Sequence, residues 1–259
     1  MGLRQSLMSG VCLVTGAAGG IGRAIIVRLA KDGYRVLAAG RRLDAVENAI
    51  ANLPGNGHRA ISLDLADEAA VIAAFANAES RGEPIDKVIA AAGILLFAPD
   101  GDTPAIVDIE LSDWNLTQAI NSTGTFLLLR EFLRGAARRN IEHGRFVGFS
   151  SVAAQLGGYR SNAAYIASKS AVLGLMKAGA RQAADLGITV NAIAPGIIDT
   201  PMLRQSLAPE NDGPVAAAVP LRRIGLPEDI AGAVAFLVGP DSSYITGAVI
   251  DINGGYRMQ

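Results

Sequence analysis

Short apolar runs alternate with amphipathic segments along most of the chain. Within these runs the side chains do not alternate between polar and apolar, which is typical of parallel strands buried on both faces. The segments between the runs repeat their apolar residues at helical spacing. The predicted strands are Ser9–Thr15, Arg35–Ala39, Arg59–Leu63, Lys87–Ala91, Arg145–Phe149, Thr189–Ala194 and Ala248–Ile252.

Helices occupy the intervals between these strands. The regular alternation predicts an α/β fold, a single-domain, doubly wound parallel sheet of the Rossmann type with about seven strands and helices on both faces. No linker, low-complexity tract or repeat divides residues 1–259. The predicted helices run approximately over Ile21–Asp32, Leu43–Leu53, Asp67–Ser80, Ser112–Arg139, Asn162–Leu186 and Pro227–Leu237.

Two segments break this rhythm. Residues 94–111 contain Pro99, Gly101 and Pro104, and residues 197–223 are Pro- and Ala-containing with weak periodicity. Both follow the carboxyl ends of predicted strands, the edge at which doubly wound sheets bind ligands. We therefore expect both segments to form walls or a lid of a substrate site.

Composition and charge narrow the classes of function. Half of the 259 residues are apolar, so a sizeable core is available, and the net charge is −1 without a basic run. This argues against a nucleic-acid groove or an acidic membrane surface as partner, and it favours a small molecule. The start Met1–Ser6 lacks the apolar core of a signal peptide, and no apolar run reaches the length of a membrane span. We expect a cytoplasmic protein.

Neither the cysteine nor the histidines suggest chemistry. Cys12 lies in an apolar run, where we expect a buried strand residue in a reducing compartment. His58 and His143 stand in loop-like sequence without acidic or cysteine companions at ligand spacing, so we expect surface residues and no metal site.

A glycine-rich turn links the first predicted strand to the first helix. Its sequence is Thr15-Gly-Ala-Ala-Gly-Gly-Ile-Gly22. Glycines there allow a tight turn and bring the backbone close to a pyrophosphate, which the helix N-terminus also attracts. The turn predicts a nucleotide site, although a purely structural turn is the alternative.

The end of the second strand bears on the choice of cofactor. An acidic residue there would accept hydrogen bonds from the ribose 2′-hydroxyl of NAD and repel a 2′-phosphate. This chain has Gly40-Arg41-Arg42 instead. Arg41 can offer a bidentate guanidinium to a phosphate, with Arg42 assisting, so NADP(H) is favoured over NAD(H). The alternative is two solvated arginines before a helix.

A tyrosine and a lysine lie four residues apart in the fifth predicted helix, Asn162–Leu186. Tyr165 and Lys169 share one helix face, and a nearby cation lowers the pKa of a phenol. The pair is a candidate general acid/base. Its plain alternative is a pair on a solvated helix face.

The pattern Thr-Gly-x-x-x-Gly-x-Gly, together with Tyr165-x-x-x-Lys169, resembles the short-chain dehydrogenase/reductase family of the ordinary single-domain kind. One position departs from the family: Ala90-Ala91-Ala92-Gly93 stands where Asn-Asn-Ala-Gly or Asn-Ala-Gly is usual, which puts local stability in question. Further matches are Asn121, Ser151, Pro195-Gly196-x-x-x-Thr200, Thr246-Gly247 and Asn253-Gly254-Gly255.

The resemblance implies roles for four catalytic residues. Tyr165 would exchange a proton with the substrate oxygen, and Ser151, preferred over its neighbour Ser150, would polarise that oxygen. Lys169 would lower the tyrosine pKa and hold the nicotinamide ribose, and Asn121 would hold a water in a proton relay.

The resemblance also implies a cofactor site and a homo-oligomer. Asp64 would meet the adenine amino group, with a helix cap as the alternative role. A homotetramer or dimer is expected, with the helices around Asn121 and Tyr165 and the final strand at its interfaces. The implied cofactor-binding residues are Gly16, Gly20, Ile21, Gly22, Arg41, Arg42, Asp64, Leu65, Ala92, Gly93, Tyr165, Lys169, Pro195, Gly196, Ile198 and Thr200.

Two classes of function follow. The first is an NAD(P)(H)-dependent oxidoreductase that interconverts a ketone and a secondary alcohol. The second is a non-catalytic NADP-binding regulatory or scaffold protein on the same fold, although the intact tyrosine and lysine argue against it. An epimerase or dehydratase of the extended branch would need a further C-terminal domain, for which we expect no room.

The substrate stays open at this stage: 3-oxoacyl thioesters, sugars, polyols and cyclic alcohols fit almost equally well. Arg160 or Arg204 is expected to meet an anionic group. Apolar walls are expected from Ile94-Leu95-Leu96-Phe97, Leu156, Leu203 and Leu207.

Overall fold

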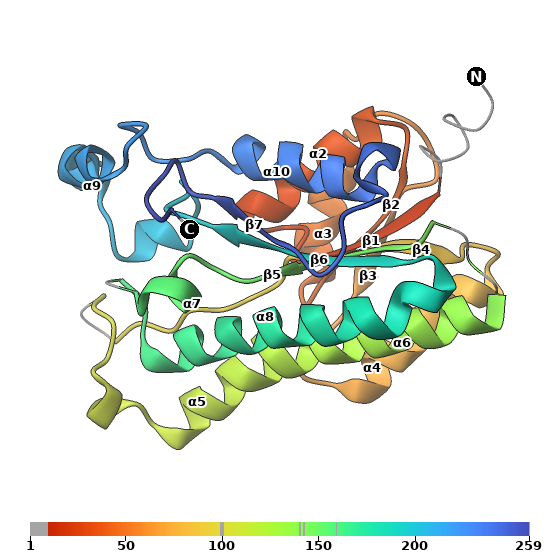
Figure 1. The fold of residues 1–259 in the computed structure, drawn as a ribbon, viewed down its shortest axis with the longest axis horizontal. Helices are drawn as coiled ribbons and strands as arrows, with labels where there is room; N and C mark the ends of the chain where they lie inside the picture. The colour runs from red at the N-terminus through yellow and green to blue at the C-terminus, as the bar shows by residue number, and fades with distance from the viewer. Residues whose placement is uncertain (1–9, 99–100, 140, 142, 159, 259) are drawn as a thin grey trace.

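Seven parallel strands form the central sheet of the computed structural model, which describes residues 10–98, 101–139, 141, 143–158 and 160–258. Their order is β3-β2-β1-β4-β5-β6-β7, so the sheet is doubly wound as expected (Figure 1). Ser9, the predicted start of the first strand, lies outside the described residues. The strands are β1 Val11–Thr15, β2 Arg35–Gly40, β3 Arg59–Ser62, β4 Ile85–Ala90, β5 Arg145–Phe149, β6 Thr189–Pro195 and β7 Val249–Ile252.

Helices cover both faces of this sheet. In Figure 1, α2 and α10 lie on one side, and α4, α6 and α8 on the other. The fold class predicted from the sequence is therefore confirmed. The helices are α2 Gly20–Lys31, α3 Leu43–Ile50, α4 Glu68–Ser80, α5 Leu111–Gln118, α6 Gly124–Arg139, α7 Ala153–Leu156, α8 Ala163–Ala183, α9 Asp212–Ala218 and α10 Pro227–Val238.

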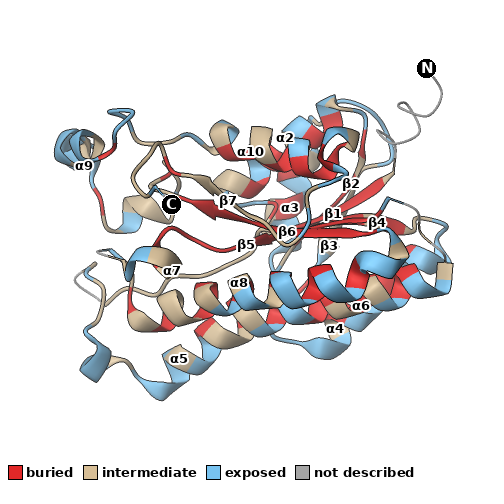
Figure 2. Cartoon of the chain, viewed as in Figure 1, coloured by how far each residue is buried: buried red, intermediate tan, exposed pale blue. Residues whose placement is uncertain are grey.

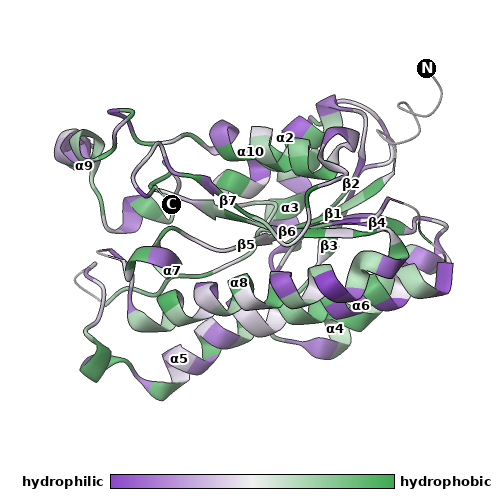
Figure 3. Cartoon of the chain, viewed as in Figure 1, coloured by the Kyte–Doolittle hydropathy of each residue, from purple (hydrophilic) through white to green (hydrophobic). Residues whose placement is uncertain are grey.

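The sheet separates two apolar cores. Leu13 packs with Phe132 and Phe146 in one core, whereas Cys12 and Val14 belong to the other. Successive strand residues point to opposite faces, so both kinds of position must be apolar, and this explains the continuous apolar runs. Buried positions and hydrophobic residues gather along the strands and the helix sides that meet them (Figures 2 and 3).

Cys12 is buried as expected, and burial raises the pKa of its thiol to about 12. His143 is exposed, also as expected. His58 differs from the expectation of a surface residue because it is half-buried and connects two segments. Its Nδ1 accepts a hydrogen bond from the Val36 N–H at 3.1 Å, which leaves Nε2 to donate to the Pro54 carbonyl at 2.9 Å.

The long helix predicted over Ser112–Arg139 is interrupted. A π-helical turn, Ala119–Thr123, separates α5 from α6. The hydroxyls of Ser122 and Thr125 donate to carbonyls four residues back, at 2.8 and 2.7 Å. Such bonds compete with the regular helical ladder, and π turns of this kind occur often at functional sites.

Segment 197–223 is more ordered than its weak periodicity indicated. It contains the helix α9 and the short 3-10 turns Leu203–Gln205 and Pro209–Asn211. Within the described residues, no helix has both the length and the apolar character needed to cross a membrane.

We predict that Gly22→Ala destabilises the fold by about 3 kcal/mol, because a Cβ there would lie 2.1 Å from the Gly16 carbonyl oxygen and neither backbone can yield easily. Gly174→Ala is the matched control. A Cβ added at Gly174 would meet no described atom within 4 Å outside the helix's own backbone. The substitution should therefore stabilise the helix α8 by up to about 1 kcal/mol. Urea unfolding measures both, and a Gly22→Ala protein as stable as the parent would show that the turn relaxes.

Candidate active site

The site lies at the carboxyl edge of the sheet, where β1, β4, β5 and β6 end. A cavity of about 300 Å³ adjoins the turn after β1, and we call it the glycine cavity. A second cavity of about 210 Å³ surrounds Tyr165 and is called the tyrosine cavity. Five residues line both, so the two cavities form one continuous cleft. These shared residues are Ile21, Ala91, Gly93, Thr200 and Met202.

Glycines keep the first cavity open. Gly16 has a φ of +69°, and a Cβ on it would lie 2.8 Å from the Ala92 Cα. A Cβ on Gly20 would lie 3.1 Å from Thr200 Cγ2 and from Pro201 Cδ, in the passage between the start of α2 and the segment after β6. No side chain caps the start of α2, so its first N–H groups are available to an anion. The turn therefore fits a pyrophosphate.

The two arginines after β2 are placed differently. Arg41 lines the glycine cavity and is exposed. Arg42 is not among the residues that line it, and its guanidinium pairs with Asp44 at 3.3 Å. Only Arg41 therefore reaches the glycine cavity, although both arginines were expected to contribute.

The contacts expected at the adenine end of the nucleotide line the same cavity. Asp64 lies beside Leu65 at the cavity wall, and its Oδ1 accepts a hydrogen bond from the Ala66 N–H at 3.0 Å. Asp67, not Asp64, is the N-cap of α4, so the simple capping alternative for Asp64 is wrong. Just after β4, the Ala92 N–H donates a hydrogen bond to Thr15 Oγ1 at the end of β1, at 3.2 Å.

Tyr165 and Lys169 lie one turn apart on α8, and both line the tyrosine cavity. Asn162 begins this helix, because its Oδ1 accepts the Tyr165 N–H at 2.9 Å. The Asn162 Nδ2 also donates to the Leu96 carbonyl at 2.8 Å. Asn162 was predicted only as the approximate helix start, so sequence reasoning missed its contact with the 94–111 segment.

The electrostatics of the pair differ from the expectation. Burial raises the pKa of Tyr165, and a hydrogen bond with Ser151 acts in the opposite direction. Burial also lowers the pKa of Lys169 to about 8, and its Nζ donates to the Phe149 carbonyl at 2.9 Å. The Lys169 Nζ lies 5.8 Å from the centre of the tyrosine ring. In the protein alone, desolvation therefore outweighs the expected lowering of the tyrosine pKa by the lysine.

The two adjacent serines at the end of β5 have separate partners. Ser150 Oγ donates to the Lys169 carbonyl at 2.9 Å and so ties β5 to α8. Ser151 Oγ accepts the Ala153 N–H at 3.1 Å, and it is the serine whose hydroxyl lowers the pKa of Tyr165. The structure therefore places Ser151, and not Ser150, beside the phenol.

Asn121 lies behind the cleft in the π-helical turn, fully buried. Its amide pairs with the backbone of Ile94 in both directions, at 2.8 and 2.9 Å, and its Nδ2 also donates to Ser168 Oγ at 3.0 Å. A Cβ on Gly93 would lie 3.0 Å from Lys169 Nζ and 3.3 Å from Asn121 Oδ1, so these two side chains converge there.

The segment after β6 completes the cleft. Pro195, Gly196, Ile198 and Thr200 all line the tyrosine cavity. A Cβ on Gly196 would lie 2.6 Å from the Asn253 Cβ, which explains a glycine at this crossing. Ala90 is buried between β1 and β5, and Ala91 forms part of the cleft wall where the family has a polar residue.

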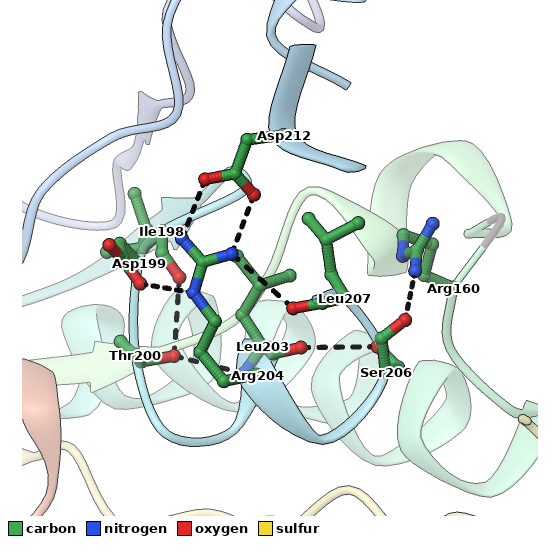
Figure 4. Close-up of polar contacts among 9 residues, drawn as sticks. All are labelled: Arg160, Ile198, Asp199, Thr200, Leu203, Arg204, Ser206, Leu207 and Asp212. Carbon is green, nitrogen blue, oxygen red and sulfur yellow. Dashed lines mark hydrogen bonds and ion pairs between the residues drawn. The ribbon is translucent and has the colours of Figure 1, made fainter. Parts of the chain in front are cut away.

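Part of the expected apolar wall, and one of the two candidate arginines, line the tyrosine cavity in the structure. Leu95, Phe97, Leu156 and Leu203 line the tyrosine cavity, whereas Leu207 is buried. Arg160 lines the cavity too. Arg204 does not, because Asp199 and Asp212 bind its guanidinium (Figure 4).

Comparison with known proteins agrees with this geometry. Residues 16–257 match the family model described as enoyl-(acyl carrier protein) reductase. The chain is 35% identical over 257 residues to short-chain dehydrogenase/reductase eriH of Hericium erinaceus, which covers 95% of this chain and 97% of that protein. It is 32% identical over 249 residues to 3-oxoacyl-(acyl-carrier-protein) reductase FabG of Escherichia coli (strain K12), which covers 96% and 97%.

A solved structure from Beutenbergia cavernae, assigned as an NAD(P)-dependent gluconate 5-dehydrogenase with bound NADP, has a TM-score of 0.85 at 33% identity and covers 95% of this chain and 96% of its own. The chain belongs to the short-chain dehydrogenase/reductase family. It is an oxidoreductase that acts on CH–OH and C=O groups with a nicotinamide cofactor. In the described part of the chain, no group of His, Cys, Asp and Glu could hold a metal ion.

We predict a pH-dependent stability difference between the parent and Lys169→Met. Below pH 8, Lys169 is protonated in both the folded and the unfolded chain, and its buried charge destabilises the folded state. Between about pH 8 and 10.5 the unfolded chain binds more protons, so the parent gains up to about 3 kcal/mol relative to the variant. Denaturant unfolding from pH 7 to 10.5 measures this difference. Lys177→Met, which replaces an exposed lysine on the same helix, is the control. A stability difference between the parent and Lys169→Met that does not change with pH would contradict the lowered pKa of Lys169.

Proposed function

We propose that the protein interconverts a ketone and a secondary alcohol by hydride transfer, with NADP(H) as the favoured cofactor and Tyr165 as the general acid/base. One observation carries the proposal. Tyr165, Ser151 and Lys169 line a small cavity that is continuous with the glycine cavity. A proton donor and a nucleotide site therefore open onto one cleft.

Each of the four candidate catalytic residues has a defined role in the proposed reduction. When bound in the cleft, NADPH would supply the hydride that reduces the carbonyl carbon and would leave as NADP⁺. Tyr165 donates its proton to the carbonyl oxygen, and Ser151 polarises that oxygen by a hydrogen bond. Lys169 would hold the nicotinamide ribose, and its charge would stabilise the phenolate that forms. Asn121 fixes the segment after β4 and belongs to the proton route that reloads the phenol.

Arg41 supports NADP(H) over NAD(H). It is exposed at the glycine cavity, and no Asp or Glu other than Asp64 is among the described residues of that cavity. A guanidinium forms bidentate bonds with phosphate, so it favours the cofactor with a 2′-phosphate. The structure from Beutenbergia cavernae, which holds NADP, is consistent with this choice.

The two irregular segments are proposed as substrate walls. Leu95 and Phe97 from residues 94–111, and Met202 and Leu203 from residues 197–223, line the tyrosine cavity. Pro99 lies outside the described residues. The relatives are named for 3-oxoacyl carrier-protein and gluconate chemistry, so an oxo acid derivative or a polyol acid is the substrate class that they support.

Location and assembly are also proposals. We infer a cytoplasmic homo-oligomer, in line with the family resemblance. Leu116 on α5 and Phe126 on α6 support the oligomer, because both side chains are more than 40% exposed although large and apolar. The helices that carry them are among those expected at an interface.

We predict that Tyr165→Phe lowers kcat/KM for carbonyl reduction by at least about 10²-fold, because the proton donor is lost. Its affinity for NADPH, measured by fluorescence titration, should stay within about twofold. Tyr244→Phe removes the same hydroxyl from a fully exposed residue and is the control. Full activity in Tyr165→Phe would refute the mechanism, and a parent protein that binds NADPH but reduces no carbonyl would favour the regulatory or scaffold alternative.

We predict that Arg41→Gln raises the KM for NADPH by about tenfold or more and leaves the KM for NADH within about twofold, because only NADPH presents a 2′-phosphate. Arg42→Gln should have a smaller effect, since Arg42 already pairs with Asp44. Initial rates with each cofactor measure the outcome. Equal losses with both cofactors would show that Arg41 does not read the phosphate.

A further inference from the structure

Arg160 is the exposed charge of the tyrosine cavity. Among the described residues that line this cavity, only Arg160 and Lys169 carry a formal charge, and neither Asp nor Glu occurs. Lys169 is 4% exposed and bonds to the Phe149 carbonyl. Arg160, in contrast, is exposed to the solvent that a substrate would displace.

Arg204 cannot serve the same purpose. Its Nε donates to Asp199 at 2.8 Å, and its two Nη atoms donate to the carboxylate of Asp212 at 2.6 and 2.9 Å. The two carboxylates raise the pKa of Arg204 and balance its charge. Figure 4 shows this cluster beside the segment that carries Ser206. Of the two arginines that the sequence offered for an anion, the structure leaves Arg160.

The partner of Arg160 is a neutral atom. Its Nη2 donates to the backbone carbonyl of Ser206, as Figure 4 shows. A guanidinium has five N–H donors in a fixed planar fork, so one bond to a carbonyl leaves an edge of the fork for a ligand. The same bond holds the arginine against the 197–223 segment. Arg160 is thus positioned without being neutralised.

The surroundings strengthen an ion pair at this place. Leu156 and Leu203 line the same cavity, so a bound substrate would displace water from beside the guanidinium and bring it among apolar groups, which would strengthen a charge-assisted hydrogen bond. A single exposed cation balances a single negative charge. A carboxylate meets this requirement, whereas a phosphate monoester would bring nearly two charges at pH 7.

We propose that Arg160 binds a carboxylate on the substrate, so that the natural substrate is a small oxo acid and its product the corresponding hydroxy acid. This inference rests on the proposed function. The carbonyl group lies at Tyr165, the carboxylate lies at Arg160, and the short apolar part between them contacts the leucine and phenylalanine walls. Arg160 is a specificity-determining residue that does not take part in hydride or proton transfer.

The test uses a matched substrate series. The full-length enzyme with NADPH is assayed on 4-oxopentanoate, 5-oxohexanoate, 6-oxoheptanoate and 7-oxooctanoate, and on the methyl ester of each. We expect at least one acid to be preferred over its ester by about tenfold or more in kcat/KM, mainly through KM. Raising the salt concentration should reduce this preference.

Three variants assign the preference to the guanidinium. Arg160→Gln should lose it, with the esters changed less than about twofold. Arg160→Lys should restore part of it, because the charge returns without the planar fork. Arg181→Gln removes an equal charge from an exposed position on α8 outside the cavity and should retain the preference.

A binding measurement separates this inference from the proposed function. The Tyr165→Phe variant, loaded with NADPH, is titrated with the preferred acid and with its ester by calorimetry. The same titrations are repeated on the double variant that also carries Arg160→Gln. Tighter binding of the acid that depends on Arg160 supports the inference even if no turnover of any carbonyl compound is found, which would refute only the proposed function.

Other outcomes overturn the inference. Esters used as well as acids, or a preference that survives in Arg160→Gln, would show that Arg160 does not recognise a carboxylate. The inference also fails if Arg160→Gln impairs reduction of a 3-oxoacyl group on acyl carrier protein while free acids and esters are used alike, since Arg160 would then contact the carrier protein.

Discussion

The site depends on the close approach of three backbone segments at the carboxyl edge of the sheet. The turn after β1 contacts the end of β4, with Gly16 against Ala92, and the start of α2 contacts the same turn, with Gly22 against Gly16. These contacts exclude side chains and keep the glycine cavity open. Gly93 follows Ala92 directly. Because Gly93 has no side chain, Lys169 and Asn121 can approach the backbone there and reach the cleft.

The chemistry then follows from desolvation. The cavity places an amine and a phenol where water is largely excluded, so in the protein alone burial lowers the pKa of Lys169 to about 8 and raises the pKa of Tyr165. A phosphate or another anion near Lys169 would oppose this effect and favour the charged amine. The free protein therefore differs electrostatically from the complex in which it would work.

Sequence patterns predicted the strands well because each strand is buried on both faces and reads as an apolar run. They also singled out Tyr165, Lys169 and Ser151 through short motifs, and the fold brings these three residues to one cavity. The patterns failed where a distant partner decides the outcome. In the break of the long helix, Asn121 bonds to the distant backbone of Ile94, and the guanidinium of Arg204 bonds to Asp212, which the fold brings to it. Neither contact leaves a periodic signal.

In the described part of the 94–111 segment, the hydrogen bonds from Asn121 and Asn162 go to main-chain groups. Asn121 bonds to the N–H and carbonyl of Ile94, and Asn162 bonds to the carbonyl of Leu96. Any residue but proline at position 94, and any residue at position 96, can offer these groups. The side chains of this wall can therefore diverge during evolution without moving the helix that carries Tyr165, and new substrates become accessible while the proton donor keeps its place.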